Sequence, residues 1–280
     1  MIENDEYNEI IKTAEQGDAI GQYNLGAMYD YGDGVEQSDE AAEKWYTLAA
    51  DQGNTDAQYS LGVMHDEEQG VLKNNKTAVN WYTLAADQGH CDAQFNLAIM
   101  YFQGDGVLED RKTAAKYFTL AAEQGEAKAQ YNMGLIYHEG KVFPKDGKTA
   151  VKWFTLAADQ DDANAQFYLG DIYARGLVVP KNVKTAVEWF TLAAEQGDAD
   201  SQYNLGQMYR EGKVLPQNDK TALSWFARSW YTKAAEQGHS KAQYNLATMY
   251  SQGDGVPVCN KTAAKWYNLA AEQSDDGQQY

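Results

Sequence analysis

The sequence predicts an all-α solenoid, an αα-superhelix of seven two-helix repeats of about 36 residues that follow an N-terminal partial repeat. Three observations predict it. A motif of alanine, an acidic residue and glutamine recurs along the chain, each repeat holds two segments with helical periodicity, and residues typical of helix ends separate these segments. The glutamine of the motif is found at Gln16, Gln52, Gln88, Gln124, Gln160, Gln196, Gln237 and Gln273. The intervals are 36 residues except for one of 41, and a fixed period of this length is typical of stacked repeats.

The first helix of a repeat is expected over about residues 19–31 of the first repeat. Leu25, Met28 and Tyr29 fall on one side of a helix that turns by about 100° per residue, together with Gly21. Such an apolar stripe indicates a helix that buries one face. We call this segment the A helix.

The second helix, the B helix, is expected over about residues 39–51, where Ala42, Trp45, Tyr46 and Ala49 form the apolar stripe. Residues that cap helix N-termini precede six of the seven B helices. They are Ser38, Asn74, Asp110, Asp146, Asn182 and Asn218, and at Cys259, the exception, the next residue Asn260 is the expected substitute. Glycine, which closes helices in the left-handed conformation, follows the B helices except at Asp161 and Ser274.

Small residues predict close contacts between helices. Glycine follows the leucine or methionine of five A helices, and tryptophans of the B helices are expected to fill the space between helices. The glycines are Gly26, Gly62, Gly134, Gly170 and Gly206. In the loops between A and B helices, Glu68, Val142, Val178 and Val214 replace glycine, so these loops are expected to be tighter or differently turned.

One helix pair is too small to bury its apolar stripe alone, so the repeats should stack into a continuous core. We expect a capping helix at 1–17, where Glu9 and Lys12 take positions held elsewhere by Trp and Leu, and an acidic tail at 274–280. The seven repeats are expected at 18–53, 54–89, 90–125, 126–161, 162–197, 198–238 and 239–273. The stripe of the last B helix lacks a polar cap, which leaves partial exposure or end-to-end self-association open.

The pattern A-x-Y-x-L-G-x-x-Y-x-x-G-x-G-V, followed by A-x-x-W-[YF]-x-x-A-A-x-Q-G, resembles the Sel-one-like repeat family, a relative of the tetratricopeptide repeat. The resemblance covers almost the whole chain. It implies an αα-superhelix whose A helices line a concave surface, in proteins that mostly act as adaptors or scaffolds for other proteins. Some members bear an old β-lactamase name, so a hydrolase stays the alternative, although those members carry a pair of cysteines in each repeat and this chain has only Cys91 and Cys259.

The composition limits the classes of partner. Acidic residues outnumber basic residues 41 to 23, and the resulting charge of −18 argues against nucleic acid and anionic membranes as partners. The start of the chain has no signal peptide, and no segment has the length of a membrane span. We therefore expect a cytoplasmic protein, with secretion by another route left open.

No motif in the sequence indicates catalysis, a metal or a cofactor. The loop after Asp30 lacks the ligands of a calcium-binding loop, and the G-x-G segments lack the context of a dinucleotide site. The four histidines have no cysteine or histidine partner at metal-ligand spacing. Most serines, acids and tyrosines recur at repeat positions, which points to architecture, so we expect a protein that is not an enzyme.

Internal comparison of the A helices predicts a binding groove on the side opposite their apolar stripe. One position in this groove is aromatic in every repeat: Tyr23, Tyr59, Phe95, Tyr131, Phe167, Tyr203 and Tyr244. Either these rings contact a ligand, or each packs against the A helix of the next repeat. Other groove positions vary between repeats: Ala27, Asp30, Val63, Asp66, Glu67, Ile99, Phe102, His138, Arg175 and Arg210.

The variable positions change along the chain. The first three repeats offer acidic and apolar side chains and no base, whereas later repeats add basic residues. The expected partner is thus a protein or peptide segment with basic and apolar residues that docks at the N-terminal half. Charge that serves solubility alone, and a passive structural spacer, remain alternatives.

The sixth repeat reads "ALSWFARSWYTKAAEQG", which contains five additional residues and two Trp-aromatic pairs. Five residues rotate a helix by about 140°, so Trp225 and Trp230 cannot face the same core. The insertion predicts either a longer B helix or a bulge, or an exposed aromatic pair that makes a second contact or a self-association site.

Overall fold

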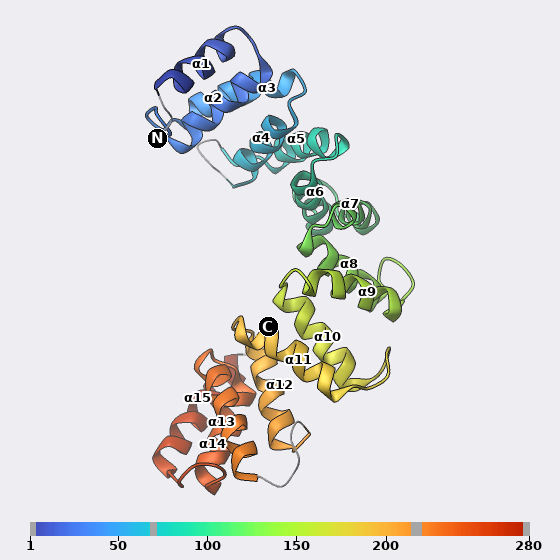
Figure 1. The fold of residues 1–280 in the computed structure, drawn as a ribbon, viewed down its shortest axis with the longest axis vertical. Helices are drawn as coiled ribbons and strands as arrows, with labels where there is room; N and C mark the ends of the chain where they lie inside the picture. Colours follow the sequence, from blue (N-terminus) through green and yellow to red (C-terminus); the bar gives the residue numbers. More distant parts are fainter. Residues whose placement is uncertain (1–3, 68–71, 214–219, 277–280) are drawn as a thin grey trace. The chain divides into compact units, whose positions relative to one another are not determined.

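The structure is a computed structural model that describes residues 4–67, 72–213 and 220–276. This described part contains fifteen α-helices and no strand (Figure 1). The chain divides into two compact units, a first unit of residues 1–136 and 140–144 and a second unit of residues 137–139 and 145–280. The predicted all-α solenoid of stacked helix pairs is confirmed.

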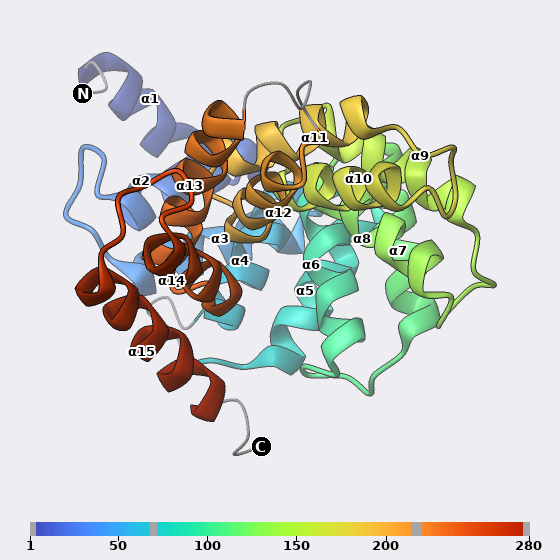
Figure 2. The same cartoon turned by 90° about the horizontal axis from the view of Figure 1, so that it is seen from below.

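The helices alternate between A and B types after the first one. Both views show an A helix beside the B helix of its own repeat, as for α14 and α15 (Figures 1 and 2). After α1 (Asn4–Glu15), the A helices are α2 (Ala19–Tyr31), α4 (Thr55–Glu67), α6 (Cys91–Gln103), α8 (Ala127–Glu139), α10 (Ala163–Arg175), α12 (Ala199–Arg210) and α14 (Ser240–Gln252). The B helices are α3 (Asp39–Asp51), α5 (Asn75–Asp87), α7 (Arg111–Glu123), α9 (Gly147–Ala158), α11 (Val183–Glu195), α13 (Lys220–Glu236) and α15 (Asn260–Asp276).

Side chains cap the B helices of the first five repeats as the sequence predicts, and the predicted cap Asn218 lies outside the described residues. Ser38 accepts a bond from the Ala41 backbone N–H at 3.2 Å, and its counterparts in the next four repeats accept the same bond. Cys259 keeps the cap position of α15, with its Sγ 3.1 Å from the Thr262 hydroxyl. Asn260 is the first helical residue, so the expected substitution by Asn260 is wrong. Cys259 stays at the cap position because its N–H donates to the Tyr250 carbonyl, and this bond closes the loop at Cys259.

The loops between A and B helices keep one length when valine replaces glycine. The N–H of Asp110 donates to the Tyr101 carbonyl at 2.9 Å, and the matching bond in the valine loop of Val178 is 3.0 Å long. Gly106 has a φ of 70°, whereas Val178 avoids positive φ. The loops of Val142 and Val178 are therefore differently turned at this residue but not tighter, and Glu68 and Val214 lie outside the described residues.

Valine and glycine exchange places across one contact between repeats. A Cβ on Gly106 would lie 2.4 Å from the backbone of Asn75, the first residue of the preceding B helix. At the matching contact Val178 occupies the loop and Gly147 begins the B helix, where a Cβ would lie 2.6 Å from Val178. One of the two positions must be small, because the loop and the helix start touch there.

The core lies between consecutive repeats rather than at one centre. Tyr46 and Ala49 of α3 pack with Leu61 and Met64 of α4, and all four side chains are buried. The B-helix tryptophans are half-buried at the edge of such clusters, as Trp81 is here. Each repeat thus completes the core of its neighbour, as stacked repeats require.

The glycines of the A helices admit the aromatic residue after the tryptophan, not the tryptophan itself. A Cβ on Gly62 would lie 2.4 Å from the Tyr82 ring, and one on Gly170 would lie 2.6 Å from the Phe190 ring. These B-helix rings are fully buried against the A helix. The expectation that glycine brings helices together is confirmed, and the filling ring is the neighbour of the one expected.

Buried glutamines join three helices at each step of the stack. Gln94 of α6 donates from Nε2 to the Ala86 carbonyl of α5 at 3.1 Å, and its Oε1 accepts a bond of 2.8 Å from Gln124 at the end of α7. Gln124 belongs to the motif that marks the repeat. The first bond recurs at Gln22, Gln58, Gln130, Gln166, Gln202 and Gln243. The motif glutamine is therefore part of the packing between repeats.

The additional residues of the sixth repeat lengthen helix α13 to 17 residues. Trp230 is half-buried and packs against the core cluster that includes Phe190 and Leu205, and the Tyr231 ring is fully buried. Phe226 is 48% exposed and stacks on Tyr209 at 5.2 Å between ring centroids. The side chain of Trp225 lies outside the described residues.

Helix α1 meets the solvent with a charged side. Glu9 and Lys12 are exposed and form an ion pair of 3.3 Å, whereas Tyr7, Ile10 and Ala14 pack against the first A helix. Across the described ranges, every helix is too short or too polar to cross a membrane.

Candidate binding faces of the A helices

The aromatic position of the groove is half-buried by the protein itself. The Tyr23 ring lies 5.7 Å from the Tyr46 ring of its own B helix, and Tyr23 also packs against the cluster that contains Leu61 of the next A helix. The same ring pair recurs at 5.3–6.0 Å in repeats two, three, five, six and seven. Packing against the next repeat is therefore present, and the half-buried rings stay partly accessible. Tyr244 differs, because it is 58% exposed.

Two of the acidic groove residues are engaged by buried tyrosines. The Tyr46 hydroxyl donates to Asp30 Oδ2 at 3.0 Å. Asp66 lies beside the Tyr82 hydroxyl, and burial raises the pKa of its carboxyl group. These carboxylates therefore connect the A and B helices of their repeats.

Repeats three, four and five cannot make this contact between a B-helix hydroxyl and the A helix. In repeats three, four and five the B-helix ring is Phe118, Phe154 or Phe190, which have no hydroxyl group. The A-helix position that holds Asp30 in the first repeat is then taken by Phe102, His138 or Ala174. Of these, His138 lies with its ring centroid 6.3 Å from Phe154, and Phe102 is 41% exposed beneath the Arg111 guanidinium.

The exposed acids on the A helices of the first unit are Asp56, Glu67 and Asp92. Ala27, Val63 and Ile99 lie half-buried on the first three A helices and add apolar surface. This combination of exposed carboxylates and partly exposed apolar side chains can contact a segment that carries both basic and apolar groups.

His90 has a structural role that the sequence reasoning missed. Its Nδ1 accepts the Ala93 N–H at 3.2 Å and so caps α6, its ring stacks on Tyr59 at 4.5 Å, and its Nε2 lies 3.6 Å from Asp56. His239 repeats the arrangement with Ala242, Tyr203 and Asp200, the last at 3.1 Å. The available signal was position, because both histidines stand where other A helices have Asp, Asn or Glu as a cap.

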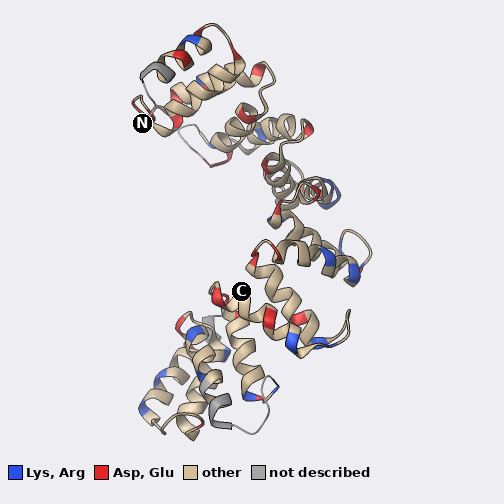
Figure 3. Cartoon of the chain, viewed as in Figure 1, with Lys and Arg blue, Asp and Glu red and all other residues tan. Residues whose placement is uncertain are grey.

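The two units differ strongly in charge (Figure 3). The first unit holds nine basic and 24 acidic residues, a net charge of −15, and the second holds 14 basic and 17 acidic residues, a net charge of −3. The contrast includes the A helices, since α2, α4 and α6 contain five acids and no Lys or Arg. Helices α10, α12 and α14 contain two acids and three bases.

In the second unit, the two arginine sites of the groove differ in their partners. Arg175 forms an ion pair of 2.6 Å with Asp171. Arg210 donates to the Asn245 Oδ1 at 3.4 Å and lies beside the Tyr231 hydroxyl, and both of these partners are neutral. The sequence predicted both arginines in one groove, but it did not show that Arg175 pairs with a carboxylate whereas Arg210 has neutral partners.

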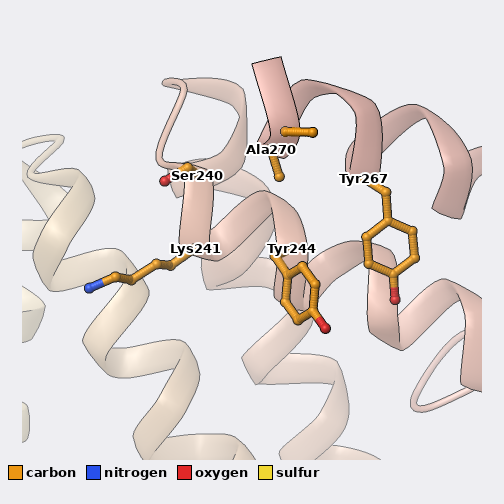
Figure 4. A pocket seen from close by; sticks show the side chains of 6 residues that line it. Ser240, Lys241, Tyr244, Tyr267 and Ala270 are labelled. Atoms are coloured by element: carbon orange, nitrogen blue, oxygen red, sulfur yellow. The ribbon is translucent and has the colours of Figure 1, made fainter. Parts of the chain in front are cut away.

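The seventh repeat carries an open pocket of about 360 Å³ (Figure 4). The rings of Tyr244 and Tyr267 meet edge to face at 5.3 Å and line it together with Ala270. Lys241, at its rim, extends away from the two rings in Figure 4. The described residues contain no group of His, Cys, Asp and Glu that could hold a metal ion.

The family model of the Sel1 repeat matches seven stretches of the chain: residues 19–54, 55–90, 91–126, 127–162, 163–198, 199–239 and 240–275. The chain belongs to the Sel1 repeat family. The resemblance read from the sequence is thus confirmed. Sel1 repeats are generally protein–protein interaction modules.

Two solved structures show the same Sel1 architecture. The chain is 37% identical to c5321, a protective antigen of uropathogenic Escherichia coli strains that displays an SLR fold, with a TM-score of 0.87. The match covers 94% of this chain and 56% of that one, so the chain spans little more than half the length of the E. coli protein. A Sel1 repeat protein from Oxalobacter formigenes is 32% identical over 99% of this chain and 81% of its own, with a TM-score of 0.75. Comparison with curated proteins finds no match.

Proposed function

We propose that this Sel1 repeat protein is a non-catalytic adaptor whose A-helix face in the first unit binds a protein segment that carries basic and apolar side chains. The observation that carries the proposal is the one-sided charge of α2, α4 and α6, which present acids and apolar groups and no Lys or Arg. Charge complementarity orients and accelerates such encounters, and buried apolar contacts supply affinity.

The side chains of this face would contribute to binding in different ways. Asp56 and Asp92 are exposed carboxylates on successive A helices, so they can meet Lys or Arg side chains of the segment. The Tyr59 and Phe95 ring edges and the partly exposed Ile99 offer apolar area between them. Asp30 and Asp66 would attract a basic segment through their long-range electrostatic potential rather than by direct contact, because the Tyr46 and Tyr82 hydroxyls already engage them.

The test uses two pools of fluorescent peptides, N-acetylated and C-amidated, in which random positions are drawn from Lys and Leu or from Glu and Leu. The intact chain should bind the Lys pool at least about tenfold more tightly than the Glu pool through the first unit. Neutralising Asp56→Asn, Glu67→Gln and Asp92→Asn together should weaken Lys-pool binding by about tenfold, since each exposed pair is worth up to about 1 kcal/mol.

A matched variant separates the face from the overall charge. Glu40→Gln, Asp51→Asn and Glu123→Gln remove the same charge from exposed B-helix and helix-end positions of the same unit. This control should keep most of the Lys-pool affinity. Equal loss in both variants would mean that net charge alone attracts the peptides, and the proposal would be abandoned.

A further inference from the structure

The chain contains a similar side-chain constellation twice, once in each unit, with two changes of charge. In repeats two and three, Asp56, Tyr59 and His90 form the capped stack described above, and Asn96 donates to the Tyr82 hydroxyl at 3.2 Å. In repeats six and seven the equivalent residues are Asp200, Tyr203, His239, Asn245 and Tyr231. The capped stack is therefore the same in both sites, but the Tyr231 hydroxyl donates to Gln207 Oε1 at 3.0 Å, whereas the Tyr82 hydroxyl accepts from Asn96. Two charged positions also differ, and they bear on what each site binds.

The two differences reverse the charge of the face. Asp66, beside Tyr82 in the first unit, corresponds to Arg210, beside Tyr231 in the second. Asp92, near the start of α6, corresponds to Lys241, near the start of α14. Both changes replace an acid by a base at a position that the packing of the repeat leaves solvent-accessible.

The bases of the second site are not neutralised. Arg175, Lys184 and Lys213 of the same unit each pair with a carboxylate. Arg210 has the neutral partners Asn245 and Tyr231, and Lys241 has no ion pair in the described part of the unit. Of the acids in the same repeats, Asp200 lies 3.1 Å from His239 Nε2 and Glu211 pairs with Lys213.

The geometry orients donors toward one ligand. Because Asn245 uses its Oδ1 to accept the bond from Arg210, its Nδ2 is left as a donor beside the guanidinium. A guanidinium next to an amide N–H matches the two oxygens of a carboxylate, and a bond to a charged acceptor is stronger than one to a neutral acceptor. Lys241 lies one helical turn before Asn245 on α14 and adds a second positive charge.

We infer that Arg210, Asn245 and Lys241 form a site for an acidic side chain, Asp or Glu, of a bound protein segment. The second unit thus recognises the charge opposite to that recognised by the first unit. This inference goes beyond the proposed function, because it concerns other repeats and a partner group of opposite sign.

The test uses the Glu–Leu peptide pool beside a Gln–Leu pool of the same length, both acetylated and amidated so that side chains supply the only carboxylates. The intact chain should bind the Glu pool about tenfold more tightly than the Gln pool. The double variant Arg210→Gln with Lys241→Gln should lower Glu-pool affinity about tenfold and leave Gln-pool affinity unchanged. Circular dichroism should show an unchanged fold, since both side chains are exposed.

The matched control is Lys148→Gln with Lys184→Gln, which removes the same charge from exposed B-helix positions of the second unit. It should retain Glu-pool binding. Equal loss in the two double variants, equal affinity for the Glu and Gln pools, or binding only of peptides with a free terminal carboxylate would overturn the inference. Binding of the Lys pool, which tests the first unit, is measured separately and can fail or succeed independently.

Discussion

Asp161 occupies a left-handed backbone position that glycine holds after other B helices. Its φ is 64°, and the matching Gly125 and Gly197 have φ values of 102° and 100°. A side chain other than glycine in this region costs of order 1 kcal/mol, although Asp tolerates it better than most. Substitution Asp161→Gly should therefore stabilise the second unit by about 0.5–1 kcal/mol after the entropy of the unfolded chain is counted. Urea unfolding followed by circular dichroism measures the change.

The reverse substitution is the control for that prediction. Gly197→Asp places the same side chain at the same position of the next repeat, where no heavy atom lies within 4 Å of the new Cβ. It should destabilise the unit by about 1–2 kcal/mol from backbone strain alone. A stabilising effect of Gly197→Asp would show that charge rather than backbone conformation governs this position.

Buried tyrosine hydroxyls predict a loss of stability in alkali. Burial raises the pKa of Tyr46, Tyr82 and Tyr231 above the usual value of about 10. The folded state therefore holds these protons more tightly than the unfolded state. The stabilisation is fully present below pH 10 and is lost as the pH rises above it.

The triple variant Tyr46→Phe, Tyr82→Phe and Tyr231→Phe should remove this dependence. Phenylalanine already fills the same position in repeats three to five, so the variant should fold. Its free energy of unfolding should be lower by about 1 kcal/mol per lost hydroxyl bond at pH 7 and fall less steeply above pH 10 than that of the parent. Denaturation curves at pH 7, 9 and 11 measure both effects, and parallel curves for the two proteins would contradict the account.

At the scale of the helix, the buried glutamines predict how firmly neighbouring elements are joined. Gln94→Met keeps most of the side-chain volume but leaves the Ala86 carbonyl without the Gln94 donor, and Gln124 Nε2 keeps only its bond to the Gly89 carbonyl. Unpaired buried polar groups cost about 1–3 kcal/mol each, so the first unit should lose about 2 kcal/mol. Replacing Gln124 as well should cost little more, because the pair acts as a unit. Additive losses in the double variant would contradict this coupling.

The helices could be predicted from the sequence because their signals are local. The segments expected over 19–31 and 39–51 coincide with α2 and α3, and the caps Ser38 and Asn74 act as expected. Periodicity and end residues are properties of a single segment, and seven copies reinforce each other.

The candidate sites were only partly predictable because their contacts join different helices. The sequence placed Asp30, Asp66 and Arg210 in one groove but not the Tyr46, Tyr82 and Tyr231 hydroxyls beside them, which belong to other helices. A comparison of the repeats does contain a signal for these contacts. The A-helix position is polar in the repeats whose B-helix ring is Tyr46, Tyr82 or Tyr231, whereas Phe102 and Ala174 occupy it where the ring is phenylalanine. The cap position of His90 is a local signal, whereas its contact with Asp56 one repeat earlier is given by no local pattern.

For the whole molecule, stacking predicts that a destabilising substitution affects mainly the helices next to it. Leu61 of α4 is buried against α3, and Leu61→Ala should cost about 2–4 kcal/mol within the first unit. Because each repeat contacts mainly its neighbours, amide hydrogen exchange should accelerate in α3, α4 and α5 and remain unchanged in α12, α13 and α14. Uniform acceleration over both units would show that the chain unfolds as one cooperative body.

Also at the scale of the molecule, the two units are proposed to bind partner segments of opposite charge. The first unit carries a net charge of −15 and the second −3, so salt should weaken the binding of the Lys pool more than that of the Glu pool. Fluorescence anisotropy of both pools between 50 mM and 500 mM NaCl measures the two slopes. Equal slopes would argue against a distinct field at each face.

The central claim is that a basic and apolar segment lies on the A helices of the first unit. The most direct measurement is photo-crosslinking of the Lys–Leu pool, with a benzophenone at one position, followed by mass spectrometry of the crosslinked chain. The account predicts crosslinks on residues 55–67 and 91–103, and their loss with Asp56→Asn, Glu67→Gln and Asp92→Asn. Crosslinks on the B helices, or on the second unit alone, would contradict it.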